Sequence, residues 1–172
     1  MPKPIGMAER EAIIARELKL TIATVHNAVR RLREAGRIAS SRPVAPLVTS
    51  RGLAKMILGA CATLPVDAPT VEEKVGALPR ASGDGAVNAE TEIVDLLEEA
   101  AGFVSGDIDF RNGDVLISAE GFGWLMVAAK RLDGATFTRL YRHKVGEFHG
   151  LQRIARIPLP TIRRIAVQLL EA

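Results

Sequence analysis

The chain has 172 residues, of which 48% are hydrophobic but only 4% aromatic, and its formal net charge is +3. A core of Ala, Val, Ile and Leu is typical of helical proteins, and this length accommodates one domain or two small ones. No run reaches the roughly 18 uncharged residues that a membrane span requires, and the N-terminus shows no secretory signal, so we expect a cytoplasmic protein without a membrane partner. Cys61 is the single cysteine, and we expect it to be a small buried residue in a reducing compartment.

Charge is segregated along the chain. Residues 1–56 hold eleven Lys/Arg against four Asp/Glu, whereas residues 57–102 hold two against nine. A basic segment followed by an acidic one predicts a polyanionic partner for the first and a different role for the second. The alternative is that these charges only solvate the surface.

The first part of the chain predicts a small helical module. Apolar residues recur at helical spacing over 13–18, 25–32 and 53–60, and Thr49 or Ser50 is the expected N-cap of the third helix. Thr70, followed three residues later by a glutamate, resembles a capping box for a further short helix.

Three stretches rich in Pro, Gly or Ser interrupt these patterns, at 40–46, 64–69 and 79–88. We place a domain boundary in the last of them. The predicted organisation is a helical domain over 1–78, a linker over 79–88 and a second domain over 89–172.

The second domain predicts a mixture of helix and strand. Residues 90–102 form an acidic amphipathic pattern, with Asn88 as a possible cap and Gly102 as its end. The Asn112-Gly113 pair lies between runs rich in Val, Ile and Phe, which is the strongest local signal for a β-hairpin turn. Three later segments have helical composition, over 121–134, 137–145 and 161–172. We therefore predict a mainly α protein whose second domain is a small α+β unit with a hairpin.

The stretch IARELKLTIATVHNAVRRLREAGRI, residues 14–38, has the clearest functional pattern. A helix-turn-helix needs a small residue where its helices cross, a tight turn, and a branched apolar anchor, and Ala15, Lys19 and Val25 occupy those positions. The second helix then has polar and basic side chains on its outward face. These side chains belong to Thr21, Thr24, His26, Asn27, Arg30 and Arg31.

This segment resembles the winged helix-turn-helix of bacterial transcription regulators, with Leu32, Gly36 and Ile38 forming the familiar end of the recognition helix. The resemblance covers roughly residues 9–56 and departs from the family at 40–46, where two prolines disfavour a two-stranded wing. It implies a winged-helix-like DNA-binding domain that inserts the helix around 23–35 into the major groove. It also implies a dimer on paired half-sites and a role in transcription regulation.

The residue types of the outward face suit contacts with double-stranded DNA. Asn can bond adenine bidentately, Arg can bond guanine or phosphate, and Thr can bond phosphate or contact the thymine methyl group. We assign contacts with base edges to Thr24, His26 and Asn27, and a contact with DNA to Thr21. Thr21 or Thr24 is the expected cap of the second helix, whose positive N-terminal end would then lie near the phosphate backbone. Phosphate contacts are assigned to Arg30, Arg31, Arg33, Arg37 and Arg42. The alternative is a helix pair that only packs or dimerises.

A second basic face is predicted from Arg153, Arg156, Arg163 and Arg164, which either touch DNA phosphates or pair with the acidic helix at 90–99.

The acidic residues after Asp107 do not fit a calcium loop, because Asn112 and Ser118 stand where glycine and glutamate are required. His26, His143 and His149 have no metal-ligand spacing, and no nucleophile, phosphate-loop or dinucleotide motif occurs. We therefore predict no enzyme activity, no metal and no cofactor.

Two further functions remain open from the sequence. One is an oligomeric DNA-recognition subunit of a phage packaging machine, similar to small terminase subunits, and the other is an adaptor that never touches DNA. A homo-oligomer, with a dimer favoured, is expected in the DNA-binding cases, and the second domain would serve oligomerisation or a protein partner.

The apolar patch at Phe122, Trp124, Leu125 and Met126 is either core or a subunit interface.

Overall fold

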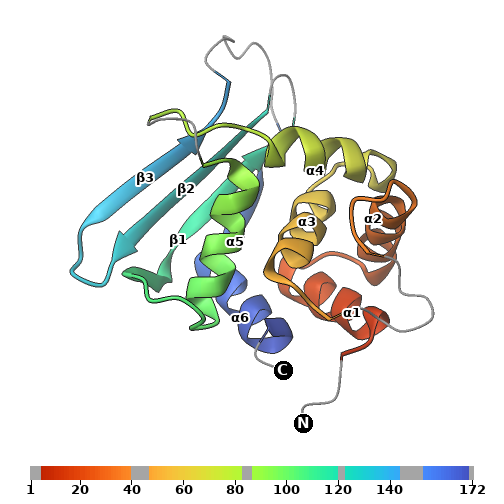
Figure 1. The fold of residues 1–172 in the computed structure, drawn as a ribbon, viewed down its shortest axis with the longest axis horizontal. Helices are drawn as coiled ribbons and strands as arrows, with labels where there is room; N and C mark the ends of the chain where they lie inside the picture. The colour runs from red at the N-terminus through yellow and green to blue at the C-terminus, as the bar shows by residue number, and fades with distance from the viewer. Residues whose placement is uncertain (1–4, 40–46, 83–86, 120–122, 144–152, 171–172) are drawn as a thin grey trace.

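The computed structural model describes residues 5–39, 47–82, 87–119, 123–143 and 153–170. Within these ranges the chain forms six α-helices, one short 3₁₀ helix and a four-stranded antiparallel sheet, and about half of it is helical. Figure 1 shows three layers: the sheet, the pair α5 (Ala89–Ala100) and α6 (Leu159–Leu170), and a group formed by the earlier helices. The fold is therefore α+β, with more strand than the sequence predicts.

The earlier helices are α1 (Met7–Leu18), α2 (Ile22–Glu34), α3 (Ser50–Ala60) and α4 (Ala68–Gly76), with a 3₁₀ turn at Pro65–Asp67 before α4. Thr49 caps α3 as predicted, because its Oγ1 accepts a hydrogen bond of 3.0 Å from the backbone N–H of Gly52. The capping box predicted at Thr70 is wrong. Helix α4 begins two residues earlier with Pro69 in its first turn, where the fixed φ of proline favours helix initiation.

The sheet has the strand order β3-β2-β1-β4, from β1 (Ile108–Ser118), β2 (Trp124–Arg131), β3 (Thr136–Tyr141) and β4 (Ala155–Pro158). The helices predicted over 121–134 and 137–145 are wrong, since these segments contain β2 and β3. Leu125, Val127 and Ala129 are buried, whereas Trp124 and the other intervening residues are partly exposed, an alternation of period two. Pairing within the sheet overrides the helical propensity of Leu, Ala and Lys in this segment.

The predicted apolar patch divides between the two faces of the sheet. Leu125 is core, Trp124 and Met126 are partly exposed on the opposite face, and Phe122 lies outside the described residues.

The hairpin turn predicted at Asn112-Gly113 is also misplaced. Strand β1 passes through this pair, Gly113 faces Ala129 of β2, and the register shifts between Ile108 and Gly113. The φ of Gly113 is +128°, and a Cβ there would lie 2.6 Å from the carbonyl oxygen of Ala128. The glycine is therefore required by an irregularity within the strand, and the connection between β1 and β2 comes after Ser118.

The two segments predicted as separate domains share one core. The segment 79–88 does separate α4 from α5, but α5 packs against α3 and α6 packs against α1. All strands in the described ranges lie between Ile108 and Pro158. The structure therefore supports an α+β class but not a winged unit. The segment 40–46, where a wing would lie, is outside the described residues.

No helix in the described parts of the chain is both long and apolar enough to span a membrane.

Candidate nucleic-acid interface

The turn between α1 and α2 consists of three residues, Lys19 to Thr21. Lys19 has φ 56° and ψ 37°, a left-handed conformation that favours glycine, and the backbone N–H of Leu20 donates to the carbonyl of Ala15 at 2.9 Å. Ala15 and Val25 are both buried. The small residue, the turn and the apolar anchor thus have the local geometry that the sequence pattern predicts.

Thr21, one of the two predicted caps, is the N-cap of α2. Its Oγ1 accepts from the backbone N–H of Thr24 at 3.1 Å and lies 2.8 Å from the Thr24 hydroxyl oxygen. The first turn of α2 has no acidic residue. The positive end of the helix dipole is therefore not offset locally, which favours an anion near this end.

The two faces of α2 differ sharply in character. Val25, Ala28, Val29 and Leu32 are buried against the neighbouring helices. Asn27 is partly exposed on the opposite side, and the side chains of Arg30 and Arg31 are 50% and 43% exposed. In Figure 1, α2 lies on the side of the helical group that is remote from the sheet.

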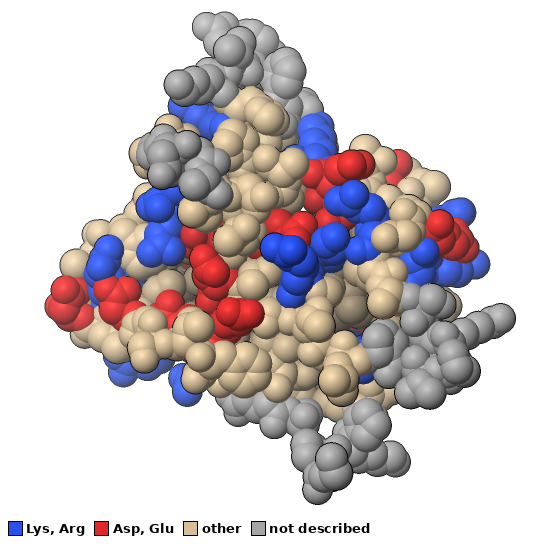
Figure 2. All heavy atoms as spheres, viewed as in Figure 1, with Lys and Arg blue, Asp and Glu red and all other residues tan. Residues whose placement is uncertain are grey.

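Both exposed arginines of α2 have the same acidic neighbour. Arg30 Nε lies 3.7 Å from Glu34, and Arg31 Nη1 lies 3.0 Å from it, with Glu34 itself 51% exposed. Figure 2 shows basic and acidic atoms side by side in this part of the molecule. An exposed ion pair of this kind contributes about 0.5 kcal/mol to stability. Each guanidinium can therefore exchange its carboxylate for a phosphate at a small cost in free energy.

His26 is held by a buried carboxylate of α1. Its Nδ1 lies 2.8 Å from Glu11 Oε2, and the Glu11 side chain is only 4% exposed while that of His26 is 52% exposed. Arg33 Nη2 lies 3.6 Å from the other Glu11 oxygen, Oε1, which has no hydrogen-bond partner among the described residues. Glu11 therefore orients the imidazole and leaves Nε2 as the ring nitrogen available to a ligand.

Arg37 faces the protein. Its Nε donates to Glu72 of α4 at 2.6 Å and its Nη2 donates to the same carboxylate at 3.3 Å. This hydrogen bonding raises the pKa of Arg37, and Glu72 is fully buried. Of the nine predicted DNA-contact residues, Thr21, Thr24, His26, Asn27, Arg30, Arg31 and Arg33 come together on α2 and its cap. Arg37 is directed elsewhere, and Arg42 lies outside the described residues.

Two arginines of the second basic face pair with acids outside the acidic helix. Arg156 donates to Asp114 at 2.8 Å, and Arg164 donates to Glu17 of α1 at 2.6 Å. The acidic helix α5 is instead paired with Arg139, 2.9 Å from Glu92, and with Arg51, 3.1 Å from Glu90. Sequence patterns do not single out Glu11 and Glu17, because no local pattern links them to partners 15 and 147 residues away.

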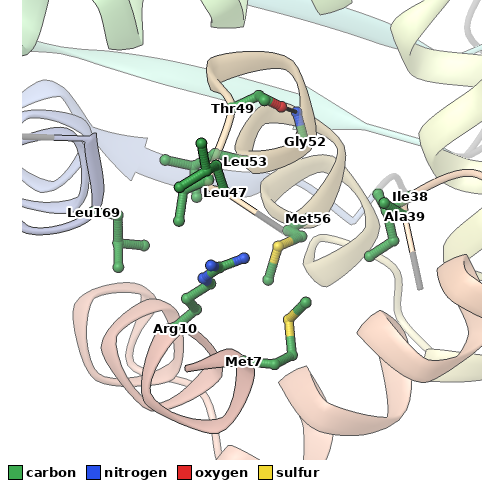
Figure 3. Close-up of a pocket in the computed structure, with 11 residues that line it drawn as sticks. Met7, Arg10, Ile38, Ala39, Leu47, Thr49, Gly52, Leu53, Met56 and Leu169 are labelled. Carbon is green, nitrogen blue, oxygen red and sulfur yellow. Dashed lines mark hydrogen bonds between the residues drawn. The ribbon is translucent and has the colours of Figure 1, made fainter. Parts of the chain in front are cut away.

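An apolar cavity of about 140 Å³ lies between α1, α3 and α6. Figure 3 shows Met7 and Met56 reaching into it from two helices, and Arg10 extending towards Leu47 and Leu53. Arg10 is buried, which lowers its pKa, and its Nε donates to the Ile5 carbonyl at 2.9 Å. Ligand sites usually exceed about 300 Å³, so we assign no ligand to this space.

Other reactive groups in the described ranges are engaged or shielded. Burial raises the pKa of the Cys61 thiol to about 12, which makes it a poor nucleophile. Hydrogen bonds from Arg111 lower the pKa of Asp109 to about 2. No three His, Cys, Asp or Glu residues within those ranges are placed to hold a metal ion.

Comparisons with protein-family models, curated proteins and solved structures found no match to this chain. Function must therefore be inferred from the geometry.

Proposed function

We propose that the protein binds double-stranded DNA with sequence preference, through α2 in the major groove, and that it acts as a transcription regulator. The observation that carries this proposal is the outward face of α2. Asn27, Arg30 and Arg31 are accessible there beside a capped N-terminus without acidic residues. In this proposal α1 and α2 act as a helix-turn-helix unit, and the glycine-like turn at Lys19 supports that assignment.

Each side chain of this face has a chemical role in the proposal. Asn27 bonds an adenine edge bidentately, and His26, oriented by Glu11, contacts a neighbouring base through Nε2. Arg30 and Arg31 leave Glu34 for phosphates, which fix the register of the helix in the groove. We leave Arg37 out of the contact set because Glu72 binds its guanidinium.

The remaining parts of the proposal concern assembly. We infer a cytoplasmic homodimer on paired half-sites, with the sheet and its helices serving oligomerisation or a protein partner. Light scattering on the protein with its DNA tests this part. A dimer with a discrete footprint supports a regulator, whereas a closed ring of many subunits would favour a packaging subunit.

The test of DNA recognition is selection of bound genomic fragments, followed by competition between the selected duplex and random DNA. Replacing Asn27 by Ala is expected to reduce the preference for the selected duplex at least about fivefold, since one bidentate base contact contributes about 1–3 kcal/mol of discrimination. Asn112→Ala is the matched control, because Asn112 is an exposed asparagine in β1. Absence of salt-sensitive DNA binding by the wild-type chain would reject the proposal in favour of an adaptor.

A further inference from the structure

A cavity of about 310 Å³ lies where the end of α1, strand β4 and the first turn of α6 meet. Lys19, Arg156 and Arg164 line it from three separate elements, together with Thr161 and Glu17. Lys19 belongs to the turn that leads directly into α2. The cavity is therefore adjacent to the positive N-terminal end of the proposed recognition helix.

The balance of charge in this cavity is positive. Glu17 is its one acidic lining residue. Arg164 donates to the Glu17 carboxylate at 2.6 Å and Arg16 donates to it at 3.0 Å, and the Arg164 hydrogen bond is the main reason that the pKa of Glu17 is lowered. Lys19 has no acidic partner within the parts of the chain that the structure describes. Arg156 is in turn bound by Asp114, so the three cations meet two carboxylates and the local balance of charge stays positive.

The polar groups around the cavity are suited to an oxyanion. Arg156 and Arg164 have side chains 69% and 54% exposed, so their guanidinium groups remain accessible beside their carboxylate partners. Helix α6 begins at Leu159, and its first turn has no acidic residue. The positive end of α6 and the negative end of α1 both border the cavity and offset one another, so the three side chains supply its positive field.

We propose that this cavity binds a backbone phosphate of the same duplex that α2 enters, which extends the DNA contact beyond α2 onto α6 and β4. The inference rests on the proposed function. Lys19 lies in the turn that leads into α2, and Asn27 lies five residues after the first residue of that helix, about 8 Å along its axis at 1.5 Å per residue. The major groove is about 12 Å wide. A base contact by Asn27 within the groove therefore brings the turn at Lys19 close to a flanking strand.

The experiment measures how the dissociation constant for the selected duplex depends on salt in three variants. Lys19→Gly removes a cation and suits the left-handed backbone at that position, so the fold is retained. Arg164→Gln removes a charge while keeping a donor for Glu17. Lys130→Ala, in the exposed end of β2, is the matched control.

We expect Lys19→Gly and Arg164→Gln each to lower the salt slope by about one, and the control to leave it unchanged. Between 50 and 200 mM salt, each of the two variants then loses about three- to fourfold less affinity than the wild type does. Unchanged slopes in both variants, with Asn27→Ala still relaxing sequence preference, overturn this inference and leave the proposed function intact. A wild-type chain that shows no salt-sensitive DNA binding overturns both.

A titration with inorganic phosphate, followed by NMR, separates the DNA backbone from a free phosphate source. Weak binding in the millimolar range that Lys19→Gly abolishes supports the assigned chemistry. Tight phosphate binding combined with unchanged DNA salt slopes overturns the DNA role and indicates a site for a free phosphate group.

Discussion

The outward face of α2 and the contact between α5 and the sheet both contain arginine–glutamate pairs, but the burial of the carboxylate differs. On α2, Arg30 and Arg31 share Glu34, whose side chain is 51% exposed. Between α5 and the sheet, Glu92 is 3% exposed, binds Arg139 at 2.9 Å and accepts from the Tyr141 hydroxyl at 2.5 Å. Arg30 and Arg31, which are 50% and 43% exposed beside an exposed acid, are available to a ligand, whereas Arg139, 25% exposed beside a buried acid, holds the fold together.

Arg37 shows why this distinction matters for the proposed interface. It lies three residues after α2 in the sequence, within the basic segment, yet its partner Glu72 is fully buried. Position in the sequence groups Arg37 with Arg30 and Arg31. The structure groups it with Arg139.

The largest effect should separate Arg37 from Arg30. Arg37→Ala leaves the Glu72 charge buried without its main partner, and we expect the free energy of unfolding to fall by about 3 kcal/mol. Arg30→Ala should change it by no more than about 0.5 kcal/mol, because its pair with Glu34 is exposed. Urea unfolding of both variants measures the difference. Equal stabilities would show that the burial of the acid does not decide the role of the arginine.

A smaller effect is expected at the junction of α1 and α6. Glu17→Gln weakens the hydrogen bonds from Arg164 and Arg16, and we expect a loss of about 1 kcal/mol at pH 7. The pKa of Glu17 is lowered in the fold from its usual 4.5, so its contribution is present above pH 4.5 and disappears as the pH falls through the lower folded pKa. Unfolding measured between pH 7 and pH 2 should therefore show the two chains converging. A constant difference across that range would contradict the assignment.

Local features of the fold were predictable wherever a short pattern has one structural meaning. The caps at Thr21, Thr49 and Asn88 each accept a backbone hydrogen bond as expected, because capping involves neighbours within three residues. The Asn112-Gly113 pair is ambiguous in the sequence, because both a hairpin turn and a bulged strand need a glycine at positive φ.

The sheet was underpredicted for a different reason. Residues 124–131 contain Leu, Ala, Lys and Arg, which favour helices, and their strand conformation depends on pairing with β1 and β3. The candidate site also depends in part on contacts between segments that are distant in the sequence. Its exposed residues follow from helical spacing, but the contact of His26 with Glu11 and the cavity between Lys19 and Arg164 depend on tertiary packing.

The central claim is that the N-terminal and outward side of α2 is the surface that meets DNA. The most direct measurement is an NMR titration of the isotope-labelled protein with the selected duplex at low salt. We predict that the largest shifts in amide resonances occur at Lys19, Thr21, Asn27 and Arg30, and that they disappear as salt is raised. Shifts concentrated in the sheet, with the α2 resonances unchanged, would contradict the account.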